Sequence, residues 1–292
     1  MGAMIALLLV LGTLTACAGG TIVDVKNALP AMAAIPDVIT YTVEVEDHGG
    51  VIRDTDGVQL VTYYYEVPVL RAFRGDGTEV QEARSPAEEK ALTAAETFNS
   101  RFSDWLAEDR LQDLTDYAAE DRAWREESGT VWDDGMAYTE SLTCEVYETE
   151  HLVSIAASCD SFTGGAHPNQ VLLSWNFDLT SGEFFAPEAL AADGQEISDL
   201  VSREISSQAR RRAAENGVEP ETMFWENYEE IAADWGSYAV SFDEAGMTVG
   251  YSPYEMACYA AGAQRFTLSY DQLLGGLSDH GKEILELTDT AP

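Results

Sequence analysis

Two adjacent glycines between two strand-like segments are the feature that most constrains how this chain can fold. Residues 152–162 and 170–179 have the apolar patterning of strands, and Gly164 and Gly165 lie between them. Glycine adopts positive φ angles and lets backbones approach closely, so the pair predicts a sharp bend or a bulge. Backbone N–H groups exposed at such a bend can hold a carboxylate or a carbonyl oxygen.

Strand and helix signals follow one another in blocks along the rest of the chain. A capping box at Ser85, Pro86 and Glu88 opens one predicted helix. The predicted helices cover residues 85–106, 111–124 and 195–215. The further predicted strands cover residues 38–45, 58–69, 136–147, 238–242, 247–251 and 265–269. These blocks predict an α+β protein in which antiparallel β-sheets pack against a few helices, with an N-terminal subregion and a larger C-terminal domain.

Three aromatic residues recur at helical spacing in the first predicted helix. They are Phe98, Phe102 and Trp105. Such a stripe can line a ligand groove, but it more often belongs to the hydrophobic core.

The N-terminus has the features of an export signal. Residues 1–16 carry no charge, and the apolar run at 5–11 is shorter than the roughly 20 residues that span a bilayer. The run ends in Leu-Thr-Ala-Cys, which resembles a lipobox, so we expect Cys17 to carry a lipid. We therefore predict a signal peptide at 1–16 and a lipid-anchored tether at 17–36. The alternative is a buried apolar element.

The charge balance restricts the partners of the chain. It has 52 acidic and 16 basic residues, which gives a formal net charge of −36. Nucleic acid is excluded as a partner because phosphate binding needs patches of Lys and Arg. The charge also keeps the protein body off an anionic membrane surface, so we expect membrane contact through the lipid only. It attracts basic partners, or it serves solubility alone.

Two motifs carry a resemblance to a known family. Ser161-Phe-Thr-Gly-Gly-Ala-His-Pro-Asn169 precedes Asp178-Leu-Thr-Ser-Gly182, and Pro253-Tyr-Glu-Met-Ala-Cys-Tyr-Ala-Ala-Gly262 follows. The set resembles the extracellular domain of RsiV-type anti-sigma factors and the non-catalytic module of PdaC-type peptidoglycan deacetylases. Met256 and Cys258 depart from the family pattern, in which Cys258 is usually Pro.

The resemblance implies a domain organisation and a location. It implies an N-terminal PdaC/RsiV-like region at 37–130, a C-terminal RsiV/PdaC-like domain at 131–280 and a tail at 281–292. It also favours export to the outer face of the cell membrane in a Gram-positive envelope.

Three cysteines remain after Cys17, namely Cys144, Cys159 and Cys258. Outside the cell one disulfide is permitted. If the two motifs pack together, it joins Cys159 to Cys258. The rival is Cys144 with Cys159, across a predicted hairpin, and a third possibility is three free thiols.

The candidate site combines residues of both motifs. From the first motif they are Gly164, Gly165, His167 and Asn169, and from the second they are Tyr254, Glu255 and Tyr259. His167 can bind a ligand or titrate near neutral pH. The alternative is a packed corner in which His167 is hydrogen-bonded to the second motif.

Catalytic motifs are missing from the sequence. The four histidines lack the spacing of a local metal site, and no Cys-x-x-Cys occurs. We expect no metal, no cofactor and no enzymatic activity.

The function predicted from these features is extracellular binding. The resemblance implies a basic, lysozyme-like protein partner, with this chain as a decoy, inhibitor or sensor. One alternative is recognition of peptidoglycan or other wall glycan. Another is an unrecognised envelope hydrolase that uses His167 and Glu255.

Overall fold

The fold begins with a long β-hairpin built around an Asp-Gly turn. Strand β1 (Ile39–Arg53) pairs antiparallel with β2 (Gln59–Arg74). The Asp54 carboxylate accepts hydrogen bonds from the backbone N–H groups of Asp56 and Val58, at 2.9 and 2.8 Å, and so fixes the turn. Both strands run further than their β-branched patterning predicted.

The structure is a computed structural model that describes residues 38–287. The predicted signal peptide, the lipid site at Cys17 and the tether lie outside these residues. No helix in the described part of the chain is both long enough and apolar enough to cross a membrane.

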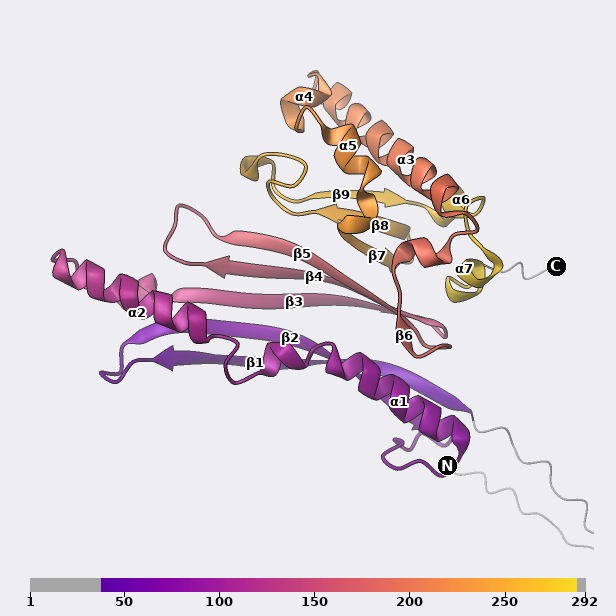
Figure 1. Cartoon of the computed structure of the whole chain (residues 1–292), viewed down its shortest axis with the longest axis horizontal. Helices are drawn as coiled ribbons and strands as arrows, with labels where there is room; N and C mark the ends of the chain where they lie inside the picture. The colour runs from indigo at the N-terminus through magenta and orange to yellow at the C-terminus, as the bar shows by residue number, and fades with distance from the viewer. Residues whose placement is uncertain (1–37, 288–292) are drawn as a thin grey trace, which may run out of the picture. The chain divides into compact units, whose positions relative to one another are not determined.

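Six strands form the first sheet, in the order β1-β2-β3-β4-β5-β6 (Figure 1). The four later strands are β3 (Tyr138–Glu148), β4 (Leu152–Phe162), β5 (Asn169–Asp178) and β6 (Glu183–Phe184). The α+β class is confirmed, but the sheet is not wholly antiparallel. Strands β2 and β3 pair in parallel from Val61↔Tyr138 to Tyr65↔Leu142, because a crossover containing two helices connects them.

The end of β2 separates from β3, and a helix covers the freed edge. In α1 (Pro86–Ser100), Asn99 accepts a hydrogen bond from the Leu70 N–H at 2.8 Å and donates one to the Leu70 carbonyl at 3.1 Å. The side-chain amide therefore replaces a neighbouring strand at this position. The Ser85 side chain caps the helix, as its sequence predicted.

The first helix is shorter than its aromatic stripe predicted. It ends at Ser100, and a 3₁₀ turn, η1 (Ser103–Leu106), precedes α2 (Gln112–Glu127). Phe98 and Phe102 are buried in the core between this segment and the sheet. Trp105 is only partly buried.

A second, antiparallel sheet packs against the longest helix. Its strands are β7 (Ala239–Asp243), β8 (Gly246–Tyr251) and β9 (Gln264–Leu268), in that order. One face packs on α3 (Gly194–Glu215) around buried residues that include Val201, Ile205 and Phe266. Figure 1 shows this sheet and α3 on the side of the first sheet opposite α1 and α2.

Edge strand β7 lies on the outer face of β4 and β5. Ser174 accepts a hydrogen bond from the Val240 N–H at 2.8 Å, and Asn176 donates one to the Val240 carbonyl at 2.8 Å. Ser154 accepts from the Phe242 N–H at 2.8 Å. The free edge of the second sheet is therefore satisfied by side chains of the first.

Short elements complete the described chain. They are η2 (Asp134–Met136), η3 (Pro187–Leu190), α4 (Pro220–Met223), α5 (Tyr228–Ala233), η4 (Trp235–Ser237), η5 (Tyr259–Ala261), α6 (Tyr270–Leu273) and α7 (Asp279–Ile284). The segment expected to be a tail thus begins inside α7, whose Ile284 is buried in the core.

Candidate functional site

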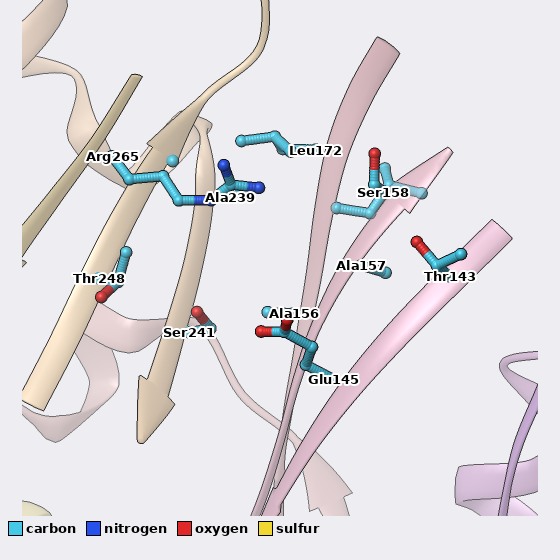
Figure 2. Close-up of a pocket in the computed structure, with 12 residues that line it drawn as sticks. Thr143, Glu145, Ala156, Ala157, Ser158, Leu172, Ala239, Ser241, Thr248 and Arg265 are labelled. Carbon is cyan, nitrogen blue, oxygen red and sulfur yellow. The ribbon is translucent and has the colours of Figure 1, made fainter. Parts of the chain in front are cut away.

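An open groove lies in the angle between the two sheets, and we call it the inter-sheet groove (Figure 2). Its volume is about 430 Å³, and it continues into a hollow of about 440 Å³ that shares Glu145 and Arg265 with it. Thr143, Ala156 and Ser158 come from the first sheet. Ser241 and Thr248 come from the second sheet.

Strand alternation explains why the walls are polar and small. On β8 the side chains of Met247 and Val249 point into the core, so Thr248 and Gly250 face the groove. A Cβ atom at Gly250 would lie 2.9 Å from the end of the Leu172 side chain, so a larger residue here would displace that side chain.

Carboxylates outnumber cations along the groove. Glu145, Asp243 and Glu244 line it, together with a single cation, Arg265. Figure 2 shows Arg265 and Glu145 extending from opposite walls. No ion pair joins them in the described structure, and both are exposed.

The negative field of these carboxylates reaches a nearby phenol. Burial, followed by the charges of Glu244, Glu286 and Asp243, raises the pKa of Tyr147, which lines the same hollow. This end of the groove therefore favours positive charge.

The two sequence motifs meet in a cluster of His167, Tyr254 and Tyr259, which we call the aromatic cluster. The His167 ring stacks on the Tyr259 ring, with centroids 3.6 Å apart and planes inclined by 17°. His167 Nδ1 lies 2.9 Å from the Pro168 carbonyl oxygen, which can only accept, so Nδ1 donates. In the neutral ring Nε2 then accepts from the Tyr254 hydroxyl, 3.3 Å away. The cluster fixes the β4–β5 loop against the segment that follows β8.

The other predicted site residues have backbone roles near this cluster. Gly164 has a φ of 77°, as the predicted bend requires, and Gly165 is exposed beside it. Asn169 is exposed at the start of β5, opposite Ser161. Glu255 accepts the backbone N–H of Ser252, so it shapes the turn rather than contacting His167.

The three cysteines are free thiols, so neither expected disulfide is formed. Cys144 lies opposite Ala157 in the β3–β4 ladder, whereas Cys159 lies opposite Leu142, so the two are offset. The Cys144 thiol donates instead to the Glu66 carbonyl at 3.2 Å. Cys159 packs on the core of the first sheet, whereas Cys258 is exposed.

The groove residues Glu145 and Arg265 were not predicted from the sequence. In the sequence they only alternate with core residues along β3 and β9. Ordinary surface positions on strands show the same alternation, so the pattern does not distinguish a groove residue. Among the described residues, no group of three or more His, Cys, Asp or Glu side chains is placed to hold a metal ion.

The fold and the groove define an α+β protein with an open cleft between two sheets. Residues 183–271 match a family described as "Protein of unknown function (DUF3298)". This match covers the second sheet, α3 and the Tyr254–Tyr259 motif. No curated protein matches the chain.

Two solved structures are similar to this one. A DUF3298 family member from Bacteroides fragilis NCTC 9343 aligns with a TM-score of 0.53 and 15% identity, over 86% of this chain and 99% of that chain. A DUF3298 family protein from Pseudomonas aeruginosa PAO1 aligns with a TM-score of 0.44 and 16% identity, over 84% and 97%. The first likeness shows a shared fold.

Proposed function

We propose that the chain is an exported, lipid-anchored, non-catalytic binding module whose inter-sheet groove receives a basic segment of a protein partner. The observation that carries the proposal is the row of Glu145, Asp243 and Glu244 along one open groove that holds a single arginine.

The groove suits an inserted Lys or Arg side chain. Its walls consist largely of small Thr, Ser, Ala and Gly residues, which leave room for a side chain. Glu145 and Glu244 are exposed and form no ion pair within the described residues. A carboxylate that meets a partner cation forms a charge-assisted hydrogen bond, which is stronger than a neutral one. The net charge of −36 steers a basic protein toward this surface.

The resemblance to RsiV-type proteins favours a lysozyme-like partner, because lysozymes are basic. The role is then that of a decoy, an inhibitor or a sensor at the outer face of the cell membrane. The aromatic cluster stabilises the groove, because it holds the β4–β5 loop against the segment that follows β8. These three strands form walls of the groove.

The test measures binding of the purified chain to hen lysozyme and to cytochrome c, a basic control, across a salt series. We expect lysozyme to bind more tightly than cytochrome c and to remain bound at physiological ionic strength. If both proteins bind equally and salt abolishes the binding, the binding reflects net charge alone and not a specific site.

Matched charge variants locate the site. Glu145→Gln with Glu244→Gln removes two groove carboxylates, and we expect lysozyme binding to weaken about tenfold or more. Glu120→Gln with Glu221→Gln removes the same charge at exposed positions on α2 and α4. If both pairs of substitutions weaken binding equally, the groove is not the site.

A further inference from the structure

The proposed function leaves Arg265 unexplained, because a cation in the inter-sheet groove opposes the entry of another cation. Within residues 38–287 the Arg265 guanidinium forms no ion pair. Arg71, Arg74 and Arg122, by contrast, each bond to carboxylates of the chain. In a protein with 52 acidic residues, an arginine that stays unpaired inside a groove indicates that the ligand supplies the anion.

The second sheet directs the Arg265 guanidinium into the groove. Arg265 on β9 lies beside Gly250 on β8, which in turn lies beside Ala239 on β7. Both neighbours are small, so the long arginine side chain can lie across the sheet, and Figure 2 shows it directed toward the first sheet. The next row along the strands presents the short hydroxyl side chains of Ser241 and Thr248. The positive charge therefore lies at the level of Ala239 and Gly250.

The two sheets touch at this end of the groove. The Leu172 N–H of β5 donates to the Ser252 Oγ at 3.1 Å, and the Leu172 side chain lies against Gly250. At the other end, Asp243 and Glu244 lie at the turn between β7 and β8, and Glu244 is exposed. The groove thus has a positive end where the sheets meet and a negative end that opens to solvent.

The strand geometry sets the spacing of these charges. Asp243 follows Ala239 by four residues along β7, which corresponds to about 13 Å at the rise of a strand. Glu145 lies opposite Ala156, and both line the groove and its continuing hollow, so they lie between the two ends. An extended chain with an anion at Arg265 therefore passes Glu145 after about two residues and reaches Asp243 after about four.

We infer that the inter-sheet groove captures the C-terminal end of a basic partner chain, with the terminal carboxylate on the Arg265 guanidinium. A guanidinium pairs with a carboxylate through two parallel N–H···O bonds, so it distinguishes a free chain end from an amide. An N-terminal ammonium group would be repelled by Arg265, and a chain that continued past this point would meet Leu172.

The same binding mode places cationic side chains of the partner on the groove carboxylates. Lys or Arg residues two and four positions before the last residue lie on the same side of an extended chain. They reach Glu145 and the Asp243–Glu244 end of the groove. The inference rests on the proposed function and narrows its partner to a free C-terminus.

The experiment compares two peptides by calorimetry at low ionic strength. One is acetyl-Lys-Ala-Lys-Ala-Ala with a free carboxylate, and the other is the same peptide as its C-terminal amide. The amide carries one more net positive charge, so general attraction to a protein of charge −36 favours the amide. We expect the reverse, with the acid binding at least about fivefold more tightly. If the acid does not bind, or if the amide binds as tightly or more tightly, the inference is overturned.

A third peptide separates a chain end from a side-chain carboxylate. Acetyl-Lys-Ala-Lys-Ala-Asp-amide has the same net charge as the acid peptide, but its carboxylate is on a side chain. We expect it to bind at least about fivefold more weakly than the acid peptide. Equal affinity of the two would overturn the assignment to a chain end.

Two arginine variants locate the carboxylate. Arg265→Gln should lower the affinity for the acid peptide at least about fivefold and remove its advantage over the amide. Arg265→Lys keeps the charge but not the paired N–H groups, so it should retain only part of that advantage. The matched control is Arg203→Gln, which removes an exposed arginine on α3 that also lacks an ion pair within residues 38–287, and the preference should stay unchanged. A preference for the acid that survives Arg265→Gln would contradict the inference.

The carboxylate variants distinguish this inference from the proposed function. Glu145→Gln with Glu244→Gln should weaken the acid and the amide alike, since both peptides carry the same lysines. If that double variant weakens both peptides but the acid has no advantage, a basic segment binds as proposed and the assignment of its end fails. If the advantage depends on Arg265 but the double variant changes neither affinity, the carboxylate site stands and the proposed cationic contacts fail.

Discussion

Replacing Ser154 by Ala tests whether buried polar side chains hold the two sheets together. Ser154 is 1% exposed, and its hydroxyl donates to Asn176 Oδ1 at 2.8 Å while it accepts from the Phe242 N–H at 2.8 Å. The substitution leaves a buried N–H and a buried amide oxygen without these bonds. Each unsatisfied group costs about 1–2 kcal/mol, so the free energy of unfolding should fall by about 2–4 kcal/mol.

The matched control is Ser158→Ala, on the same strand and the same face. The Ser158 hydroxyl bonds to the side chains of Asp160 and Gln170 and is only partly buried, so water can replace it. Its loss should cost less than about 1 kcal/mol. Equilibrium urea unfolding followed by tryptophan fluorescence measures both variants. Equal costs for the two substitutions would refute the role of the network.

Two further predictions follow from backbone geometry and from thiol burial. Gly57→Ala places a Cβ at a φ of 83° in open space, so the free energy of unfolding should fall by about 1–2 kcal/mol. At Gly246 the Cβ would lie 2.0 Å from a backbone oxygen, so urea unfolding of Gly246→Ala should show a clearly larger loss of stability. Burial raises the pKa of Cys144 to about 12 and that of Cys159 to about 11. Because the folded values lie above the unfolded value of about 8.5, the contribution of these thiols to stability is complete below that pH. It is lost as the pH rises to about 11 for Cys159 and to about 12 for Cys144. The free energy of unfolding should therefore fall less steeply in alkali when both are replaced by Ala, and an unchanged slope would contradict the shift.

Local sequence signals predicted most elements of the fold but not their assembly. The cap at Ser85 and the bend at Gly164 are encoded within a few residues, and the structure has both. The parallel pairing of β2 with β3 joins residues more than seventy positions apart. No local pattern specifies such a register, because it depends on how α1 and α2 pack in the connection.

The candidate site was predictable in part. The motif pattern implied that His167 lies near the second motif, and the structure brings it to Tyr254 and Tyr259. Trp105 had two interpretations, core or groove. It lines an open pocket over the β1–β2 hairpin, whereas Phe98 and Phe102 are core residues. Helical spacing could not separate these uses, because the helix ends at Ser100.

The inter-sheet groove follows from how the second sheet is attached. Two sheets that pack face to face exclude water between apolar faces about 10 Å apart. Here β7 touches the first sheet through backbone groups that bond to Ser154, Ser174 and Asn176, so the sheets meet along an edge. An edge contact leaves the neighbouring face of β3 and β4 uncovered, which is why Thr143 and Ser158 occupy positions that would be apolar in a sandwich. Ser154, Ser174 and Asn176 pair with the backbone edge of β7, and this edge contact also leaves the cleft open beside it.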